Sequence, residues 1–261
     1  VVELYHEATR AMLARAGGGS AASLRPLLQA LFFEARVAQQ RVITEEHLEA
    51  AARRVADEGA LLRLRERLAA DRMPLLSLLQ TRPLRVQAAH LSFQEFFAAL
   101  AICEGATPPE PPWALPAWWA NTVRLGSEMS GAFGEGLRRA AGERLRLKSV
   151  RLIVTGEART ACIALGLALR TEPRVESVQV ARHALRLVEL RQGAPNLSLS
   201  LARSRAGDSD VMVLAAFAQG AATLETLSLA QTTVGRDGVL AALSVPSLIS
   251  LDLSGCRRLS D

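Results

Sequence analysis

The sequence has few cysteines, few aromatic residues and no long hydrophobic run. Its 261 residues include three cysteines, Cys103, Cys162 and Cys256, which lie far apart. An odd, scattered set argues against a disulfide framework and favours a reducing compartment, so we expect a cytoplasmic protein. No apolar stretch is long enough to span a bilayer, and the first residues have no signal-peptide pattern, so no membrane partner is expected.

The scarcity of aromatic residues and the mild charge bear on nucleic-acid binding. Aromatic residues make up 4% of the chain, and 31 basic against 26 acidic residues give a net charge of +5. The basic residues are nearly all arginine and alternate with acids, as at Arg65, Glu66 and Arg67. This alternation is typical of solvated helix faces, and few rings are present on which bases could stack. Nucleic acid is therefore not a predicted partner.

The chain also lacks the usual motifs of catalysis. It contains no G-x-x-x-x-G-K-[ST] motif, so nothing in it would cradle a triphosphate. No pair of cysteine or histidine residues has zinc-ligand spacing. Cys103 and Cys162 lie in apolar helical segments, which are typical of inert buried thiols. We therefore expect no enzyme, no catalytic residue, no metal and no cofactor in this chain itself.

What the sequence does contain is a repeated apolar pattern in its second half. Phrases of the form L-x-x-L-x-L recur at intervals of 21 to 28 residues, and helix-like segments at 157–169 and 208–219 lie between them. The inward positions are Leu147, Val150, Leu152, Val175, Val178, Val180, Leu199, Leu201, Leu224, Leu227, Leu229, Leu248, Leu251 and Leu253. A period in this range predicts leucine-rich repeats, with Cys256 at the position where a side chain bonds or packs against loop backbone. We therefore predict an α then α/β fold, ending in a ribonuclease-inhibitor-like leucine-rich-repeat solenoid.

Polar residues alternate with these inward positions and define a candidate partner surface. Alternate residues of a strand point to opposite faces, so the outward ones would share a concave face of the solenoid. The predicted partner-binding residues are Arg151, Gln179, Arg182, Ser200, Arg203, Ser228, Gln231 and Asp252. This polar, partly basic ribbon would suit a protein or another ligand with acidic or hydroxyl groups.

The first half has helical spacing followed by a change of period. Thr44 is a plausible N-cap, with Glu45 and Glu46 in the first helical turn. Short apolar runs at 75–79 and 84–88 predict a hairpin, which completes a winged-helix-like outline. Five prolines between 105 and 116 mark a boundary. We predict a helical, winged-helix-like region at 1–104, a proline- and tryptophan-rich connector with a linking helix at 105–144, and about five truncated repeats at 145–261.

The sharpest local pattern begins at His90. Ser92 and Glu95 have the spacing of a capping box, which predicts that Ser92 caps a helix running to about Cys103. Residues 85–99, R-V-Q-A-A-H-L-S-F-Q-E-F-F-A-A, resemble the segment that closes the winged-helix region of NACHT-type STAND nucleotide-switch proteins, where H-x-[ST]-F-Q-E-[FY]-x-A-A is found. Residues 3–5 and 41–46 resemble the same family. A downstream repeat array is the commonest animal arrangement of that family, as in the NOD-like receptors of innate immunity.

The resemblance implies a role for the whole chain. It implies the regulatory and ligand-sensing part of a NACHT–leucine-rich-repeat signalling protein, with protein–protein interaction through the repeats. It further implies that His90 contacts the phosphates of ADP, held with ATP by a domain upstream of Val1 that would contact this chain. The alternative for His90 is a histidine that packs in a turn and bonds a carbonyl group.

An alternative function also remains at this point. A repeat adaptor could recruit protein substrates, for instance to ubiquitin ligation, without any nucleotide switching. A P-loop upstream of Val1 would separate the two hypotheses. Both ends of the chain look cut, so we interpret the sequence as a fragment.

Overall fold

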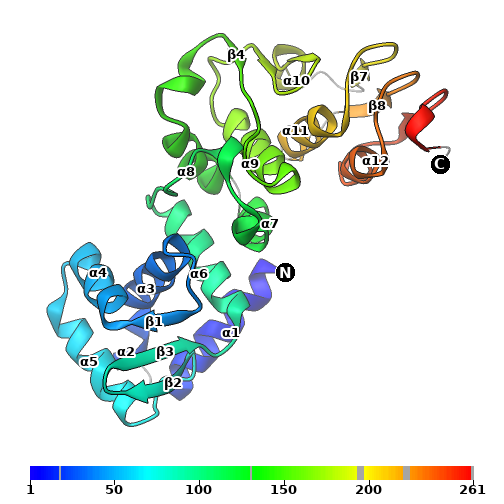
Figure 1. Cartoon of the computed structure of the whole chain (residues 1–261). Helices are drawn as coiled ribbons and strands as arrows, with labels where there is room; N and C mark the ends of the chain where they lie inside the picture. Colours follow the sequence, from blue (N-terminus) through cyan, green and yellow to red (C-terminus); the bar gives the residue numbers. More distant parts are fainter. Residues whose placement is uncertain (18, 130, 193–196, 220–223, 260–261) are drawn as a thin grey trace. The chain divides into compact units, whose positions relative to one another are not determined.

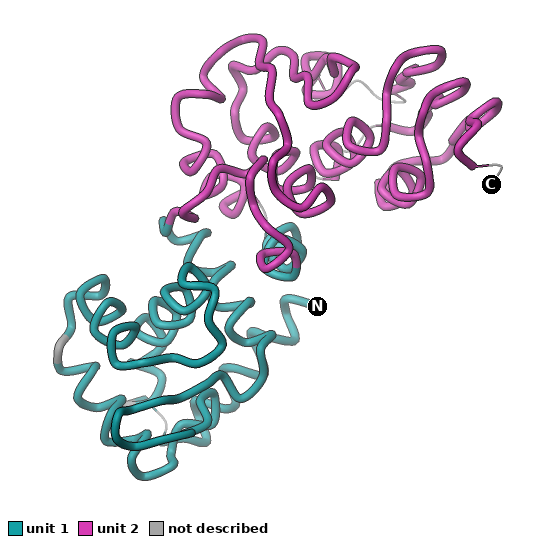
Figure 2. The backbone as a smooth tube through the Cα atoms, viewed as in Figure 1, with its two compact units in different colours: residues 1–106, 121–129 teal, residues 107–120, 130–261 magenta. Residues whose placement is uncertain are grey.

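The computed structural model describes residues 1–17, 19–129, 131–192, 197–219 and 224–259, and the chain divides into two compact units. Unit 1 comprises Val1–Ala106 and Asn121–Met129, and unit 2 comprises Thr107–Ala120 and Ser130–Asp261 (Figure 2). The chain therefore leaves unit 1 in the proline-rich segment and returns to it for nine residues. Within the described ranges, no helix has the length and apolarity needed to cross a bilayer.

Unit 1 is built mainly from helices around α3. The helices are α1 (Val2–Arg15), α2 (Gly19–Ala22), α3 (Arg25–Val37), α4 (Glu45–Val55), α5 (Glu58–Ala69), α6 (Leu91–Cys103) and α7 (Ala120–Ser127). The apolar face of α3 packs against α4 and α6, and Phe32 stacks on Phe97 with ring centroids 5.4 Å apart. Both rings are completely buried, so this aromatic contact lies at the centre of the unit's core.

A small antiparallel sheet completes unit 1. Its strands are β1 (Val42–Thr44), β2 (Leu76–Thr81) and β3 (Leu84–Ala88), in the order β1-β3-β2. The predicted hairpin is confirmed, since β2 and β3 are the two runs identified from the sequence. Thr44 is also confirmed as the cap of α4, and its backbone N–H donates to Nδ1 of His47 at 3.1 Å.

The described residues of unit 2 form four longer helices that pack in chain order. Its helical elements are η1 (Pro112–Ala114), η2 (Ala117–Trp119), α8 (Gly131–Ala141), η3 (Gly142–Arg146), α9 (Ala158–Arg170), α10 (Val188–Arg191), α11 (Asp208–Ala218), α12 (Arg236–Leu243) and η4 (Arg257–Leu259). Helix α9 packs against α8 on one side and α11 on the other, and α11 packs against α12 (Figure 1). The helices predicted at 157–169 and 208–219 are therefore confirmed as α9 and α11.

The described strands of unit 2, except for β6, occur where the repeats predict them, but they do not form the predicted solenoid. They are β4 (Ser149–Arg151), β5 (Ser177–Gln179), β6 (Ala184–Arg186), β7 (Leu197–Ser200), β8 (Leu224–Ser228) and β9 (Ser250–Asp252). They pair as two separate sheets, β4-β5-β6 and β7-β8-β9. With the sheet of unit 1, the described residues hold three small sheets, none of which forms a solenoid. The predicted leucine-rich-repeat solenoid is therefore wrong.

The break between the two sheets has a physical cause in the shortest repeat interval. Only 21 residues separate Val178 from Leu199, which is too few for a full helical return. The chain instead turns back as β6, which pairs antiparallel with β5 and places Leu185 opposite Val178. Strand β6 thus occupies the edge at which β7 would have to pair for a continuous parallel sheet.

Parallel pairing does occur in the second sheet, where the intervals are longer. Leu227 of β8 lies opposite Leu199 of β7 and Leu251 of β9. The Sγ of Cys256 donates to the carbonyl oxygen of Leu229 at 3.0 Å, which confirms the backbone-bonding role predicted for this cysteine. Successive strand–helix layers are therefore held together by loop contacts as well as by the sheet.

Candidate functional site

His90 occupies an exposed position at the N-terminus of α6. Its Nδ1 accepts a hydrogen bond from the backbone N–H of Ser92 at 3.2 Å and lies 2.6 Å from the Ser92 Oγ. The imidazole itself is therefore the side-chain cap of α6. When Nδ1 accepts, the neutral ring carries its proton on Nε2, so Nε2–H is the group available to donate to an anion. This geometry differs from the alternative in which the ring bonds a carbonyl group.

The predicted Ser92–Glu95 capping box is wrong. Helix α6 already begins at Leu91, so Ser92 lies inside the first turn and Glu95 is one turn further along. The Ser92 hydroxyl bonds the His90 ring, and the Glu95 side chain is buried in unit 1. Ser92 and Glu95 have the spacing of a capping box, but the residue that caps the helix is His90.

Sequence reasoning missed a buried polar cluster around Glu95. Nη2 of Arg36, on α3, donates to Oε1 of Glu95 at 3.3 Å, and the Asn121 side-chain amide donates to Oε2. The Arg36 side chain is 1% exposed and that of Glu95 10% exposed. Burial lowers the pKa of Arg36 to about 10, with the Glu95 carboxylate opposing the shift. The guanidinium is therefore charged at neutral pH. The available signal was an arginine within the apolar face of the α3 sequence.

The predicted partner ribbon of unit 2 is divided between the two sheets. Arg151 and Gln179 lie side by side on β4 and β5. Ser200, Ser228 and Asp252 are aligned across β7, β8 and β9, and the Ser228 hydroxyl donates to Oδ2 of Asp252 at 3.0 Å. Hydrogen bonds from Ser254 and Ser228 lower the pKa of the Asp252 carboxyl. The ribbon is therefore two short polar rows.

The remaining ribbon residues lie in the loops after the strands. Arg182 is exposed in the bend between β5 and β6. Arg203 and Gln231 are also exposed, and both have left-handed backbones with φ of 58° and 57°. Their N–H groups donate to the carbonyl oxygens of Ala230 and Ser254, each at 2.8 Å. Because these hydrogen bonds fix the backbone, the Cα–Cβ bonds of both exposed residues have defined directions.

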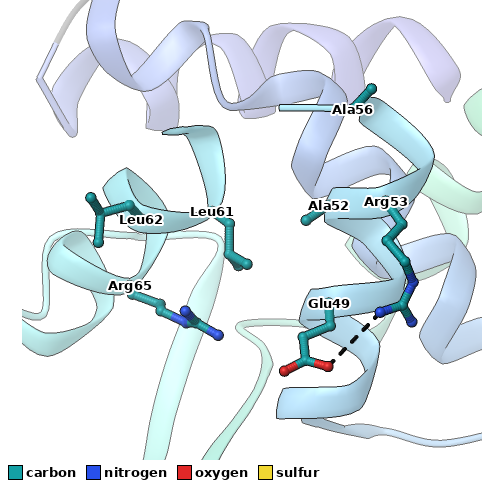
Figure 3. A pocket seen from close by; sticks show the side chains of 7 residues that line it. All are labelled: Glu49, Ala52, Arg53, Ala56, Leu61, Leu62 and Arg65. Atoms are coloured by element: carbon teal, nitrogen blue, oxygen red, sulfur yellow. Dashed lines mark ion pairs between the residues drawn. The ribbon is translucent and has the colours of Figure 1, made fainter. Parts of the chain in front are cut away.

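Unit 1 also has a surface hollow between α4 and α5, with a volume of about 860 Å³. Figure 3 shows its lining, in which Glu49 and Arg53 on α4 form an ion pair at 3.9 Å, while Leu61, Leu62 and Arg65 come from α5. Arg65 is itself paired with Glu45. The hollow therefore combines apolar walls with paired charges.

The described residues contain no group of three or more His, Cys, Asp or Glu side chains that could hold a metal ion. Cys162 is completely buried, and burial raises the pKa of its thiol to about 11. The thiolate, and not the thiol, is the nucleophile. A thiol with so high a pKa is hardly ionised at neutral pH and is therefore a poor nucleophile there. The surroundings of Cys162 therefore match the inert buried thiol interpretation of its sequence.

We expect thiol labelling to distinguish the three cysteines. Cys103 is partly exposed, whereas Cys162 and Cys256 are buried. A shift in pKa from 9.0 to about 11 leaves Cys162 about 100-fold less thiolate at neutral pH. Iodoacetamide at neutral pH, followed by peptide mass spectrometry, should therefore modify Cys103 first. All three cysteines should react alike in guanidinium chloride, and rapid native modification of Cys162 would contradict the prediction.

Comparisons with known proteins leave the family resemblance untested. A scan of the chain against protein-family models gives no match, and a search of curated proteins finds no significantly similar sequence. The similarity of residues 85–99 to NACHT-type proteins therefore stays a prediction, and the function argued from it is a proposal.

Proposed function

We propose that this chain is the regulatory and sensing part of a NACHT-type nucleotide-switch protein. In this proposal unit 1 responds to the ADP or ATP held by a separate nucleotide-binding domain, and unit 2 binds a protein or another ligand. The observation that carries the proposal is the exposed His90 at the N-terminus of α6, within the segment that resembles the family motif.

The chemistry of this position supports a phosphate contact. The amides at a helix N-terminus carry partial positive charge, which favours an anion. The two contacts of Nδ1 with Ser92 orient the imidazole, so Nε2–H has a defined direction. A nucleotide presented by another domain would meet a donor already held in place. The chain itself contains no P-loop, so the nucleotide would belong to that other domain.

The two polar rows of unit 2 support its role in binding. Arg151, Arg182 and Arg203 are exposed. Together with the hydroxyl groups of Ser200 and Ser228 they would suit an acidic protein segment. The partner would then bind at unit 2, and the signal would pass to unit 1 within the same chain.

The test uses the parent protein and two substitutions of His90. We expect the coding sequence upstream of Val1 to encode a P-loop lysine motif. In that protein, His90→Ala removes both the cap and the imidazole donor, whereas His90→Asn keeps a good capping side chain. Both variants should release ADP about tenfold faster, since each loses one charge-assisted hydrogen bond to phosphate. Stopped-flow fluorescence with a labelled ADP would measure this rate.

The asparagine variant separates the two roles of His90. If the ring only caps α6, His90→Asn will release ADP at the wild-type rate and only His90→Ala will differ. That result would overturn the proposed contact between His90 and the nucleotide, and it would support the role of His90 as the cap of α6. Absence of a P-loop from the parent would overturn the switch itself.

A further inference from the structure

Strand β2 is an edge strand of the sheet in unit 1, and a surface hollow lies along its free side. The sheet order β1-β3-β2 places β1 and β2 at the two edges (Figure 1). A hollow of about 900 Å³ is lined in part by Leu76, Ser77 and Leu78 of β2. Consecutive side chains of a strand point to opposite faces, so all three residues can line one hollow only at an edge of the strand. Because β3 occupies one edge of β2, the hollow lies along the other.

Backbone groups of β2 are directed toward this hollow. The N–H of Ala89, just after β3, donates to the carbonyl oxygen of Leu75 at 3.0 Å, so that carbonyl group faces the β3 side. In an antiparallel ladder alternate residues turn their backbone groups to the same side. Ser77 therefore faces β3, whereas Leu76 and Leu78 face the free edge. The N–H of Leu76 donates to the carbonyl oxygen of Met73 at 2.9 Å. The carbonyl of Leu76 and both backbone groups of Leu78 are therefore placed to pair with an added strand.

The lining of the hollow combines an apolar floor with a positive rim. Met73 and Leu76 line it and are buried. Arg15, in the last turn of α1, and Arg72, in the loop before β2, also line it and are exposed. Among the residues that the structure describes, neither guanidinium group forms an ion pair or a hydrogen bond. Asp71 adds one negative charge to the lining, so the two arginines leave it with a net positive charge.

We propose that β2 is the docking edge for an extended acidic segment of a partner protein, which adds to the sheet as a fourth strand. Hydrogen bonds to the backbone of Leu76 and Leu78 would hold the segment, and the hollow would receive its side chains. The guanidinium groups of Arg15 and Arg72 favour a carboxylate, because such charge-assisted hydrogen bonds are strong and often bidentate. The apolar floor favours an aliphatic side chain two residues away, on the same face of the extended segment.

The hollow between α4 and α5 differs in both respects. Its arginines, Arg53 and Arg65, are each paired with a glutamate, and its lining comes from two helices, which use their backbone groups internally. Charge and backbone pairing therefore both favour the β2 hollow as the docking site. This site uses neither His90 nor the polar rows of unit 2, so it stands or falls independently of the proposed function.

The test lets the chain choose among peptides. The immobilised full chain is panned against phage that display random linear peptides of about six residues, the length of an ordinary strand. We expect enrichment of peptides with an aspartate or glutamate and an aliphatic residue two positions away. The most enriched peptide is then labelled, and its affinity is measured by fluorescence polarisation. Failure to enrich any peptide, or enrichment of basic peptides, overturns the proposal.

Substitutions in the hollow test the contribution of each group. Arg15→Glu and Arg72→Glu should each weaken binding of the acidic peptide about tenfold or more, because each places like charges together. Asp71→Asn should tighten binding about threefold, since it removes a repelling carboxylate. Asparagine also tolerates the left-handed backbone at this position, where φ is 51°. Leu78→Pro should weaken binding more than Leu78→Ala, because both lose the leucine side chain and only proline removes the N–H at the free edge.

A control in unit 2 makes each outcome decisive. Arg151→Glu changes an exposed arginine of a polar row, and it should leave binding of the peptide unchanged. If Arg151→Glu weakens binding while Arg15→Glu and Arg72→Glu do not, the peptide binds unit 2 and the β2 site is overturned. Equal binding by all the variants overturns it as well. Circular dichroism would verify that every variant is folded.

Discussion

Replacing Gly166 with alanine is expected to destabilise unit 2 by about 3 kcal/mol or more. Gly166 lies on the face of α9 that packs against α11. A Cβ there would lie 2.6 Å from the carbonyl oxygen of Val213 and 2.7 Å from the Cβ of Ala216. Neither atom belongs to a flexible side-chain end, so the two helices would have to move apart. The loss of packing should exceed the roughly 1 kcal/mol that alanine contributes to helix propensity.

The measurement is urea unfolding followed by tryptophan fluorescence. All three tryptophans, Trp113, Trp118 and Trp119, belong to unit 2, so their emission follows that unit. Gly131→Ala is the matched control, because a Cβ at Gly131, on α8, would meet no atom within 4 Å. The control should be unchanged or stabilised by up to about 1 kcal/mol. Equal effects of the two substitutions would show that α9 and α11 are not in close contact.

Replacing Glu95 with alanine is expected to destabilise unit 1 by about 3–5 kcal/mol. The substitution removes the carboxylate that accepts from Arg36 on α3 and from Asn121 on α7. The Arg36 guanidinium would then be left in the core with its charge uncompensated by Glu95, at 1% exposure. Breaking a buried pair on one side costs far more than the pair itself contributes, because the remaining charge has lost its hydration.

Hydrogen exchange of peptides from α3 and α6 would measure this effect within unit 1. The exposed Glu7–Arg10 pair on α1 supplies the control, and Glu7→Ala should change stability by less than about 1 kcal/mol. The double variant Arg36→Met, Glu95→Leu should recover most of the loss, because it removes both charges together. If the α3 and α6 peptides of Glu95→Ala exchange their amide hydrogens at the wild-type rate, the Arg36–Glu95 pair does not hold α3 against α6.

Local patterns in the sequence determined most of the secondary structure. The helical spacing of apolar residues predicted α9 and α11, and the change of period predicted the β2–β3 hairpin. These predictions succeeded because periodicity depends only on which face of an element is buried. The strands of unit 2, except for β6, were placed by the same reasoning. His90 was identified from a local resemblance, although its role as the cap of α6 was not.

The tertiary structure alone decided how these elements pair. The sequence predicted five parallel strands in one solenoid, but β6 turns back on β5 and closes that edge, so two sheets result. Glu95 has the spacing of a capping residue, yet its carboxylate meets Arg36, which is 59 residues away. In both cases the outcome depends on a group that is distant in the sequence. Strand β6 pairs with the edge of β5, and Arg36 pairs with the buried carboxylate of Glu95. Local spacing carries no information about that choice, because pairing energy arises only when the chain has folded.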